Sequence, residues 1–192
     1  MDDDGIVIDA AMLRKTALGL LLLLAISGLC AWLLKDPLVA LGQAFLDRFG
    51  LPGLFIGTII ADTSPLPLTH EPLTFIGIAA GIPPITLLAT IASASVSAGP
   101  LGWFFGRLFL SETRLAAWLE KKHPRLNSTM RRNGLKVVAI AALLPIPFAL
   151  ATWTSGMLRL PLHKVCALSL LRIVKVWLYF QLLHLGWLAG GG

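Results

Sequence analysis

The stretch Asp62-Thr-Ser-Pro-Leu-Pro-Leu-Thr-His-Glu71-Pro72 places two carboxyl groups and three prolines inside sequence that is otherwise typical of membrane-spanning segments. A carboxylate in hydrocarbon is costly, about 2.5–3.5 kcal/mol on insertion scales, so such a group is rarely accidental. Proline breaks helical backbone, and broken backbone at membrane depth is tolerated only where protein or a water-filled cavity covers it. The stretch therefore predicts a re-entrant turn and is the first candidate for a functional site.

The composition around this stretch is that of a polytopic membrane protein. Of the 192 residues, 56% are hydrophobic and only 14% are charged, and the mean hydropathy is +0.80. Cys30 and Cys166 lie inside apolar runs and are interpreted as small core residues. The histidines are unclustered, and no nucleophile, nucleotide or metal motif is found. We therefore expect neither an enzyme nor a cofactor or metal site.

Three apolar runs are long enough to cross a bilayer as helices, which takes about 20 residues. They are residues 16–34, 85–110 and 165–188. The second run is rich in Ala, Ser and Gly and contains Gly102-x-x-x-Gly106. This pattern predicts close packing against another helix.

Basic residues predict the orientation of the chain. Arg14 and Lys15 end the segment 1–15 and flank the first run, so this N-terminal segment is expected in the cytoplasm. The connection 107–136 carries eight basic and two acidic residues and is placed on the same side. The net charge of +6 is thus assigned to a membrane surface, and nucleic acid is not an expected partner.

Four shorter apolar pieces, 50–61, 73–80, 135–144 and 148–157, flank two proline-rich breaks. None reaches the length of a span, so each pair is expected to enter and leave the membrane by one face as a re-entrant hairpin. The residues assigned to the re-entrant turns are Pro65, Pro67, Pro72, Pro145, Pro147 and Gly156.

The hairpins belong to two units, about 49–110 and 133–188, with the same order of motifs. Hairpins entering from opposite faces would make the units inverted repeats, as in transporters that work by alternating access. The predicted fold is an all-α integral membrane domain over 16–188, followed by the tail 189–192. It has three transmembrane helices, two inverted re-entrant hairpins, and amphipathic surface helices near 38–49 and 111–132.

Several motifs recur in a fixed order: Gly50-x-x-Gly53, Pro65-x-Pro67-x-x-x-Glu71 followed by Gly81, Gly102-Trp-Phe-Phe-Gly106-Arg107, and Gly134 with Leu144-Pro145-x-Pro147 and Gly156. Through them, about residues 45–187 resemble the DedA superfamily of VTT-domain, SNARE-associated-type membrane proteins, and its YqaA-like branch. The resemblance implies a multi-pass protein of the bacterial inner membrane. It implies translocation of undecaprenyl phosphate or phospholipid, with use of the proton gradient.

The second proline turn departs from the family pattern. Many members carry Arg-x-x-Pro-x-x-Arg there, whereas this chain has Ala142 and Phe148 at the arginine positions. Two cationic groups that could hold a lipid phosphate are therefore missing. The basic residues that remain near this turn are Arg107, Arg159, Arg172 and Lys175.

Three residues of the first proline stretch are candidates for proton transfer. Glu71 is expected to exchange a proton as the site opens to either side, and a structural carboxyl is the alternative. Asp62, at the end of a half-helix, either caps amides of the turn or joins the site. His70 titrates in the physiological range, and a hydrogen-bonding role is the commoner alternative to a proton relay.

Three basic residues are candidates for contact with substrate. Arg172 and Lys175 share a face of the last span, where they can serve as counter-charges for Glu71 or for a lipid phosphate. The alternative is that both reach the cytoplasmic interface. We favour an interior position for Arg172, the interface for Lys175, and interface anchoring for Arg107.

The leading hypothesis is a transporter that moves a lipid or lipid-linked phosphate between leaflets, with proton coupling through Glu71. Its expected partners are a membrane lipid with an anionic or polyprenyl phosphate headgroup and protons, and a homo-oligomer is left open. Two alternatives are a secondary transporter of a small ion or solute, and a non-transporting scaffold that binds partners through 107–136.

Overall fold

The computed structural model describes residues 10–64, 70–110, 124–144 and 148–191, without the side chains of residue 110, of 124–131 and of several residues in 10–31. Within these residues every regular element is a helix. The predicted all-α fold is confirmed. Four of the prolines assigned to the turns, Pro65, Pro67, Pro145 and Pro147, lie outside the described residues.

The first element, α1, runs from Ala10 to Thr63 and consists of three segments. The backbone is non-helical at Leu34 and at Gly50, where φ is 58°. Pro37 and Pro52 follow these breaks within the next helical turn, where a proline is tolerated. The breaks agree with the predicted end of the first span and with the predicted start of the first half-helix.

The remaining elements are α2 (Glu71–Ala79), α3 (Pro84–Phe105), the π-helical turn η1 (Gly106–Leu110), α5 (Pro124–Leu143), α6 (Phe148–Met157), α7 (Leu162–Ser169) and α8 (Arg172–Ala189). The expected piece 148–157 is confirmed as α6. The expected span 165–188 is divided between α7 and α8, because the hydrogen bonds tighten to i→i−3 around Leu170 and Leu171. The described part of the expected surface helix 111–132 and the half-helix after it join in α5, which passes through Gly134 without a break, while residues 111–123 lie outside the described residues.

Among the described residues, three helical stretches are long and apolar enough to cross a membrane: Trp32–Thr63, Pro84–Phe109 and Leu162–Ala189. The second and third coincide with predicted spans. The first begins where the side chains of α1 are continuously described and joins two shorter apolar segments across Gly50, so the predicted span 16–34 stays a prediction. Residues 16–33 are helical, but many of their side chains lie outside the described residues.

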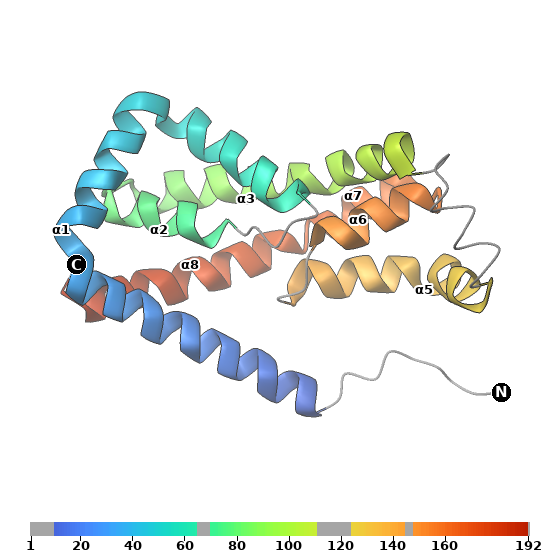
Figure 1. Ribbon diagram of the computed structural model, residues 1–192, viewed down its shortest axis with the longest axis horizontal. Coiled ribbons are helices and arrows are strands. Elements are labelled where there is room, and N and C mark those ends of the chain that lie inside the picture. Colours follow the sequence, from blue (N-terminus) through green and yellow to red (C-terminus); the bar gives the residue numbers. More distant parts are fainter. Residues whose placement is uncertain (1–9, 65–69, 111–123, 145–147, 192) are drawn as a thin grey trace.

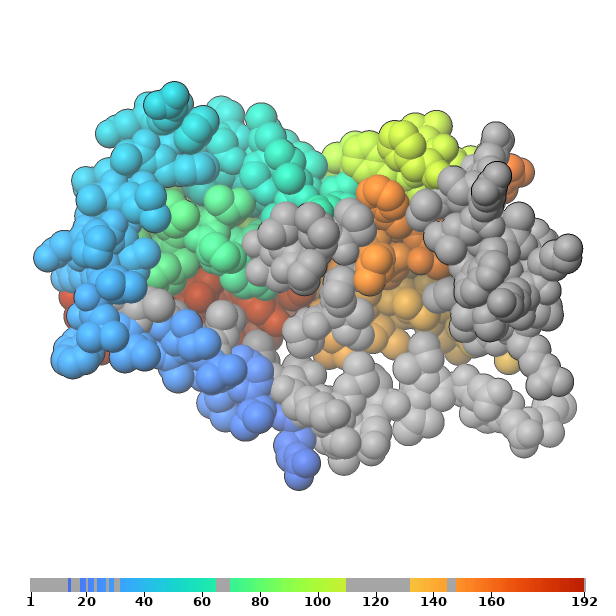
Figure 2. Space-filling model, in the orientation of Figure 1, coloured from blue at the N-terminus to red at the C-terminus, as the bar shows by residue number. Residues whose placement is uncertain are grey.

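Two helix pairs run toward the middle of the molecule from opposite ends (Figure 1). The first helix pair is the third segment of α1 (51–63) with α2, and the second helix pair is α5 with α6. In the space-filling view the first pair, cyan to green, and the second pair, gold to orange, lie in opposite halves of the molecule (Figure 2). Helix α3 passes beside both pairs, and α7 and α8 return in the opposite direction. The re-entrant character of the two pairs stays a prediction.

Both helix pairs end in the same turn. A residue with positive φ follows each pair, Gly81 (φ 76°) after α2 and Arg159 (φ 58°) after α6. Its N–H donates to the carbonyl three residues back, and the next N–H donates to the carbonyl five residues back, at 2.9–3.1 Å. Pro83 and Pro161, two residues further on, are the N-caps of α3 and α7.

Glycines allow α3 and α6 to touch through their backbones. A Cβ added at Gly106 would lie 1.9 Å from the Trp153 carbonyl oxygen, and one at Gly156 would lie 1.9 Å from that of Trp103. The packing predicted from Gly102-x-x-x-Gly106 is therefore confirmed. Gly156, assigned to a re-entrant turn, lies instead in the last turn of α6, where the crossing with α3 needs it.

Two groups of buried apolar side chains flank the middle of the molecule. One lies between the first helix pair, α3 and α8 and includes Ile91 and Val176. The other lies between α5, α6 and α7 and includes Phe148. Ser95 follows Ile91 by one turn on α3, and Arg172 precedes Val176 by one turn on α8. Polar side chains therefore meet where the two apolar groups adjoin.

Candidate functional site

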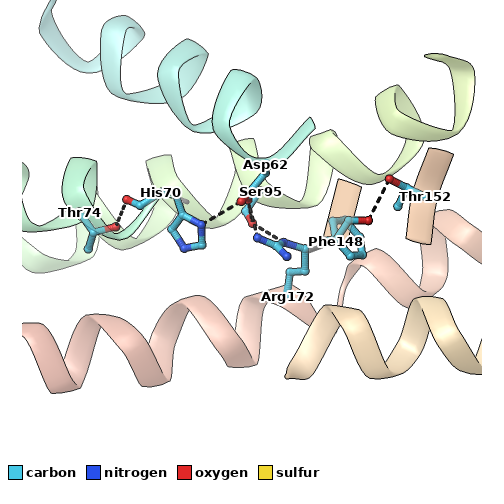
Figure 3. A network of polar contacts seen from close by, with 7 residues as sticks. All are labelled: Asp62, His70, Thr74, Ser95, Phe148, Thr152 and Arg172. Atoms are coloured by element: carbon cyan, nitrogen blue, oxygen red, sulfur yellow. Dashed lines mark hydrogen bonds and ion pairs between the residues drawn. The ribbon is translucent and has the colours of Figure 1, made fainter. Parts of the chain in front are cut away.

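Asp62 is the centre of a buried polar network (Figure 3). Its Oδ1 lies 3.1 Å from His70 Nδ1, and its Oδ2 accepts hydrogen bonds from Ser95 Oγ and Arg172 Nη2, each at 2.5 Å. Only 7% of Asp62 and 1% of Arg172 is exposed. The network brings together the inner end of α1, the residue before α2, the middle of α3 and the start of α8.

Two of the three guanidinium nitrogens of Arg172 have hydrogen-bond partners, and the third has none among the described residues. Its Nε donates to Ser95 Oγ at 2.5 Å, and its central carbon lies 4.4 Å from the centroid of the Phe148 ring. The Nη1 atom is buried and has no hydrogen-bond partner among the described residues. Because a guanidinium binds oxyanions through two nitrogens at once, Nη1 is a donor for a further anion.

Local structure places each of these residues. Asp62 is the last residue but one of α1. His70 is the N-cap of α2, where its carbonyl accepts hydrogen bonds from the Thr74 amide (3.0 Å) and hydroxyl (3.2 Å). Pro72 lies in the first turn of α2, a position that needs no N–H donor. The backbone therefore directs the two side chains toward each other, as Figure 3 shows.

The network compensates charges that are otherwise expensive to bury. A charge taken out of water costs several kcal/mol unless a partner and hydrogen bonds replace its hydration. Asp62 has a cation, a hydroxyl and an imidazole within hydrogen-bond distance. Its carboxylate and Arg172 therefore depend on each other, and the loss of either leaves the other buried and uncompensated.

Glu71 stands next to this network but outside it. Its Oε2 is buried and has no hydrogen-bond partner among the described residues, and no ion pair within 4.0 Å joins it to a described cation. The expected pairing of Arg172 with Glu71 is not found, because Arg172 forms its ion pair with Asp62 at the end of α1.

The other two basic candidates lie in different surroundings. Lys175 is buried beside Arg172, and its Nζ lies 5.3 Å from the centroid of the Tyr179 ring. The interface position favoured for Lys175 is therefore wrong, because the face of α8 that carries Arg172 and Lys175 is buried. Arg107 is partly exposed in η1, 12 residues after Ser95 on the same helix, about 18 Å away at 1.5 Å per residue.

Two residues of the network carry little signal in the sequence. Ser95 is one small residue among many in the run 85–110, although a hydroxyl in the middle of a span is itself a polar signal. Phe148 stands out in the sequence only because arginine is missing there, whereas its ring lies against the Arg172 guanidinium. Among the described residues no group of three or more His, Cys, Asp or Glu is placed to hold a metal ion.

Comparison with known families supports the expected relationship. The family model of the VTT domain matches residues 66–185, well over half of the chain. The match includes His70, Ser95 and Arg172, and Asp62 lies four residues before it. A search of curated proteins and a search of solved structures found no match. The chain belongs to the DedA family of membrane proteins, whose VTT domain it carries over residues 66–185.

Proposed function

We propose that this protein moves a lipid or lipid-linked phosphate between the leaflets of a bacterial inner membrane. The observation that carries the proposal is the Asp62–Arg172 ion pair, buried between two helix pairs of a VTT-domain protein. An ionised pair at membrane depth is expensive to maintain without a function. Helix pairs that enter from opposite faces would give the pair access to either leaflet in turn.

In this mechanism the headgroup phosphate replaces a carboxylate. Nη1 of Arg172 makes the first contact, since it has no partner among the described residues. The phosphate then displaces Asp62 from Nη2, because carboxylate and phosphate match the same guanidinium geometry. Lys175, one turn along the same buried face of α8, provides a second cation for the headgroup.

Glu71 supplies the proton step. Its Oε2 is buried and has no hydrogen-bond partner among the described residues, so this oxygen is the position at which we place the transferred proton. We assign proton uptake to Glu71 in the open site and proton release when the site faces the other side of the membrane. Asp62 is the less suitable proton carrier, because Arg172, Ser95 and His70 hold its carboxylate.

Lipid movement in liposomes tests the proposal. A fluorescent lipid is placed in both leaflets, and dithionite bleaches the molecules that reach the outside. Wild-type protein is expected to raise the bleached fraction above the half that an intact bilayer allows, and Glu71→Gln to lower that rise at least tenfold. Asp47→Asn is the matched control, because it removes an exposed carboxylate of α1. Lipid movement unchanged in Glu71→Gln would remove the proton step.

One observation favours a second candidate, a secondary transporter of a small ion or solute. Ala142 and Phe148 are buried and apolar where many relatives carry arginine, so the site has less positive charge for a phosphate. Wild-type vesicles that move no lipid but accumulate a labelled solute under a proton gradient would support this function over the first.

A further inference from the structure

Trp153 connects the two helix pairs beside the polar network. It lies on α6, five residues after Phe148, and its Nε1 donates a hydrogen bond to the backbone oxygen of Thr63 at 2.9 Å. Thr63 is the last residue of α1 and follows Asp62 directly. The bond therefore ties the segment that carries Asp62 to the helix that carries Phe148.

The Thr63 carbonyl is a group that needs a partner from outside its helix. The last four carbonyls of a helix have no intrahelical donor, and a buried carbonyl left unpaired costs free energy. Thr63 is only 5% exposed. The indole N–H of Trp153 therefore caps the C-terminal end of α1 by donating to the Thr63 carbonyl. Any movement of the α1 end away from α6 leaves both groups unpaired.

Trp153 is itself fixed from the side of α3. Its backbone packs directly on Gly106, and its ring lies 5.8 Å from the ring of Phe105, centroid to centroid. The α3–α6 crossing leaves no room for Trp153 to follow α1. A movement that breaks the bond therefore has to come from the end of α1, which carries Asp62.

We propose that Trp153 is a positioning residue that latches the end of α1 in the closed arrangement. Opening of the Asp62–Arg172 site then requires release of the Trp153–Thr63 hydrogen bond. The role of the latch in lipid movement rests on the proposed function. The latch itself does not, because it governs access of water to the site whatever the site carries.

Thiol labelling of the latched helix end tests the proposal. The reporter is Thr63→Cys in full-length protein in liposomes, with Cys30 and Cys166 replaced by alanine. The Thr63 hydroxyl has no partner among the described residues, so its replacement leaves the carbonyl acceptor in place. We expect Trp153→Phe to raise the labelling rate by a water-soluble maleimide about fivefold, the factor that corresponds to one neutral hydrogen bond.

Trp103→Phe is the matched control. Trp103 is also partly buried and donates its indole N–H to a backbone oxygen, that of Leu160, at 2.8 Å, but it does not touch α1 through this bond. Equal labelling rates in the two variants would overturn the latch. Benzothienylalanine at position 153 keeps the ring shape without the N–H and must label as fast as Trp153→Phe; labelling at the wild-type rate would assign the effect to packing.

The labelling result also separates the latch from the proposed function. Faster labelling in Trp153→Phe without any lipid movement in wild type would keep the latch and remove lipid transport. Thermal unfolding of both tryptophan variants in detergent shows whether the fold is retained. A Trp153→Phe protein that unfolds well before Trp103→Phe and gains labelling at exposed positions too would reduce Trp153 to a structural residue and overturn the proposal.

Discussion

The two helix pairs end in the same turn and carry different chemistry at their inner ends. The first pair brings Asp62 and Glu71 to the middle of the molecule, with His70 at the N-cap of α2. The second pair brings Phe148, whose ring faces a guanidinium that comes from α8. One backbone design thus provides the anionic groups in one pair and the apolar support in the other.

The apolar character of the second pair agrees with Ala142 and Phe148, which stand where the family pattern has arginine. Ala142 and Phe148 are fully or almost fully buried in the apolar group between α5, α6 and α7. The cations of this chain come instead from Arg172 and Lys175 on one face of α8. The positive charge therefore lies on α8, and the second pair contributes the Phe148 ring that faces the Arg172 guanidinium.

Removal of the Arg172 cation, which lies between the two pairs, is expected to have the largest effect on stability. Arg172→Met leaves Asp62 buried without its ion partner, and the expected loss of unfolding free energy is about 3–5 kcal/mol. Thermal unfolding in detergent, followed by circular dichroism, measures it. Lys164→Met is the control, because Lys164 is exposed in α7. The double variant Asp62→Asn/Arg172→Met should lose less than the two single changes added together. Additive losses would mean that the pair does not act as a unit.

The helix breaks were predictable because proline and glycine act on their own backbone. The end of the first helix, the start of the half-helix at residue 51, and α6 at Phe148–Met157 all follow from such local chemistry. The small-residue pattern around Gly102 likewise predicted a close helix crossing, since the absence of a side chain is a local property too.

The partner of Arg172 was not predictable in the same way. Asp62 and Glu71 are nine residues apart and both flank the proline turn, so their order along the chain does not say which one meets α8. Packing decides it, through the angle at which the end of α1 meets α3 at Ser95. The inward position of Lys175 depends on the rotation of α8 about its own axis, which the sequence leaves open because apolar residues surround it.

The second prediction compares the glycines of the two pairs. Gly156→Ala would place a methyl group 1.9 Å from the Trp103 carbonyl oxygen, which belongs to rigid backbone. Gly77→Ala, in α2, meets the methyl end of Leu87, which can move aside. We expect Gly156→Ala to cost about 1–3 kcal/mol or more and Gly77→Ala distinctly less, as judged by thermal unfolding. A larger loss in Gly77→Ala would place the tighter crossing in the first pair.

The third prediction concerns the apolar support of the second pair. Phe148→Leu keeps the site apolar and removes the aromatic face from Arg172, which lies 4.4 Å from the ring centroid. The expected cost is about 1–2 kcal/mol in unfolding free energy, because the cation is desolvated. In an Arg172→Met background the same change should cost less, because the ring no longer faces a cation. Equal costs in both backgrounds would assign the effect to lost volume alone.

The smallest expected effect concerns the turn that the two pairs share. Arg159 has a φ of 58°, a conformation that costs a residue with a side chain about 1–2 kcal/mol relative to the right-handed region, whereas glycine adopts it readily. Arg159→Gly should therefore stabilise the protein by up to about 1 kcal/mol, after the entropy that glycine adds to the unfolded chain. Gly81→Ala should destabilise it by about 1 kcal/mol, although open space surrounds the added methyl group.

A reciprocal pair of small shifts in melting temperature, upward for Arg159→Gly and downward for Gly81→Ala, would show that the two turns follow the same backbone rule. A control for the loss of an exposed charge is needed. Lys164→Gly does not provide it, because Lys164 lies inside α7, where glycine weakens the helix. Arg159→Ala is the better one: it removes the same exposed charge without relieving φ, so it should leave the melting temperature nearly unchanged. If Arg159→Ala raises the melting temperature as much as Arg159→Gly does, the stabilisation comes from loss of the charge. The positive φ of residue 159 would then not be the cause, and the two turns would share their shape without sharing the backbone rule.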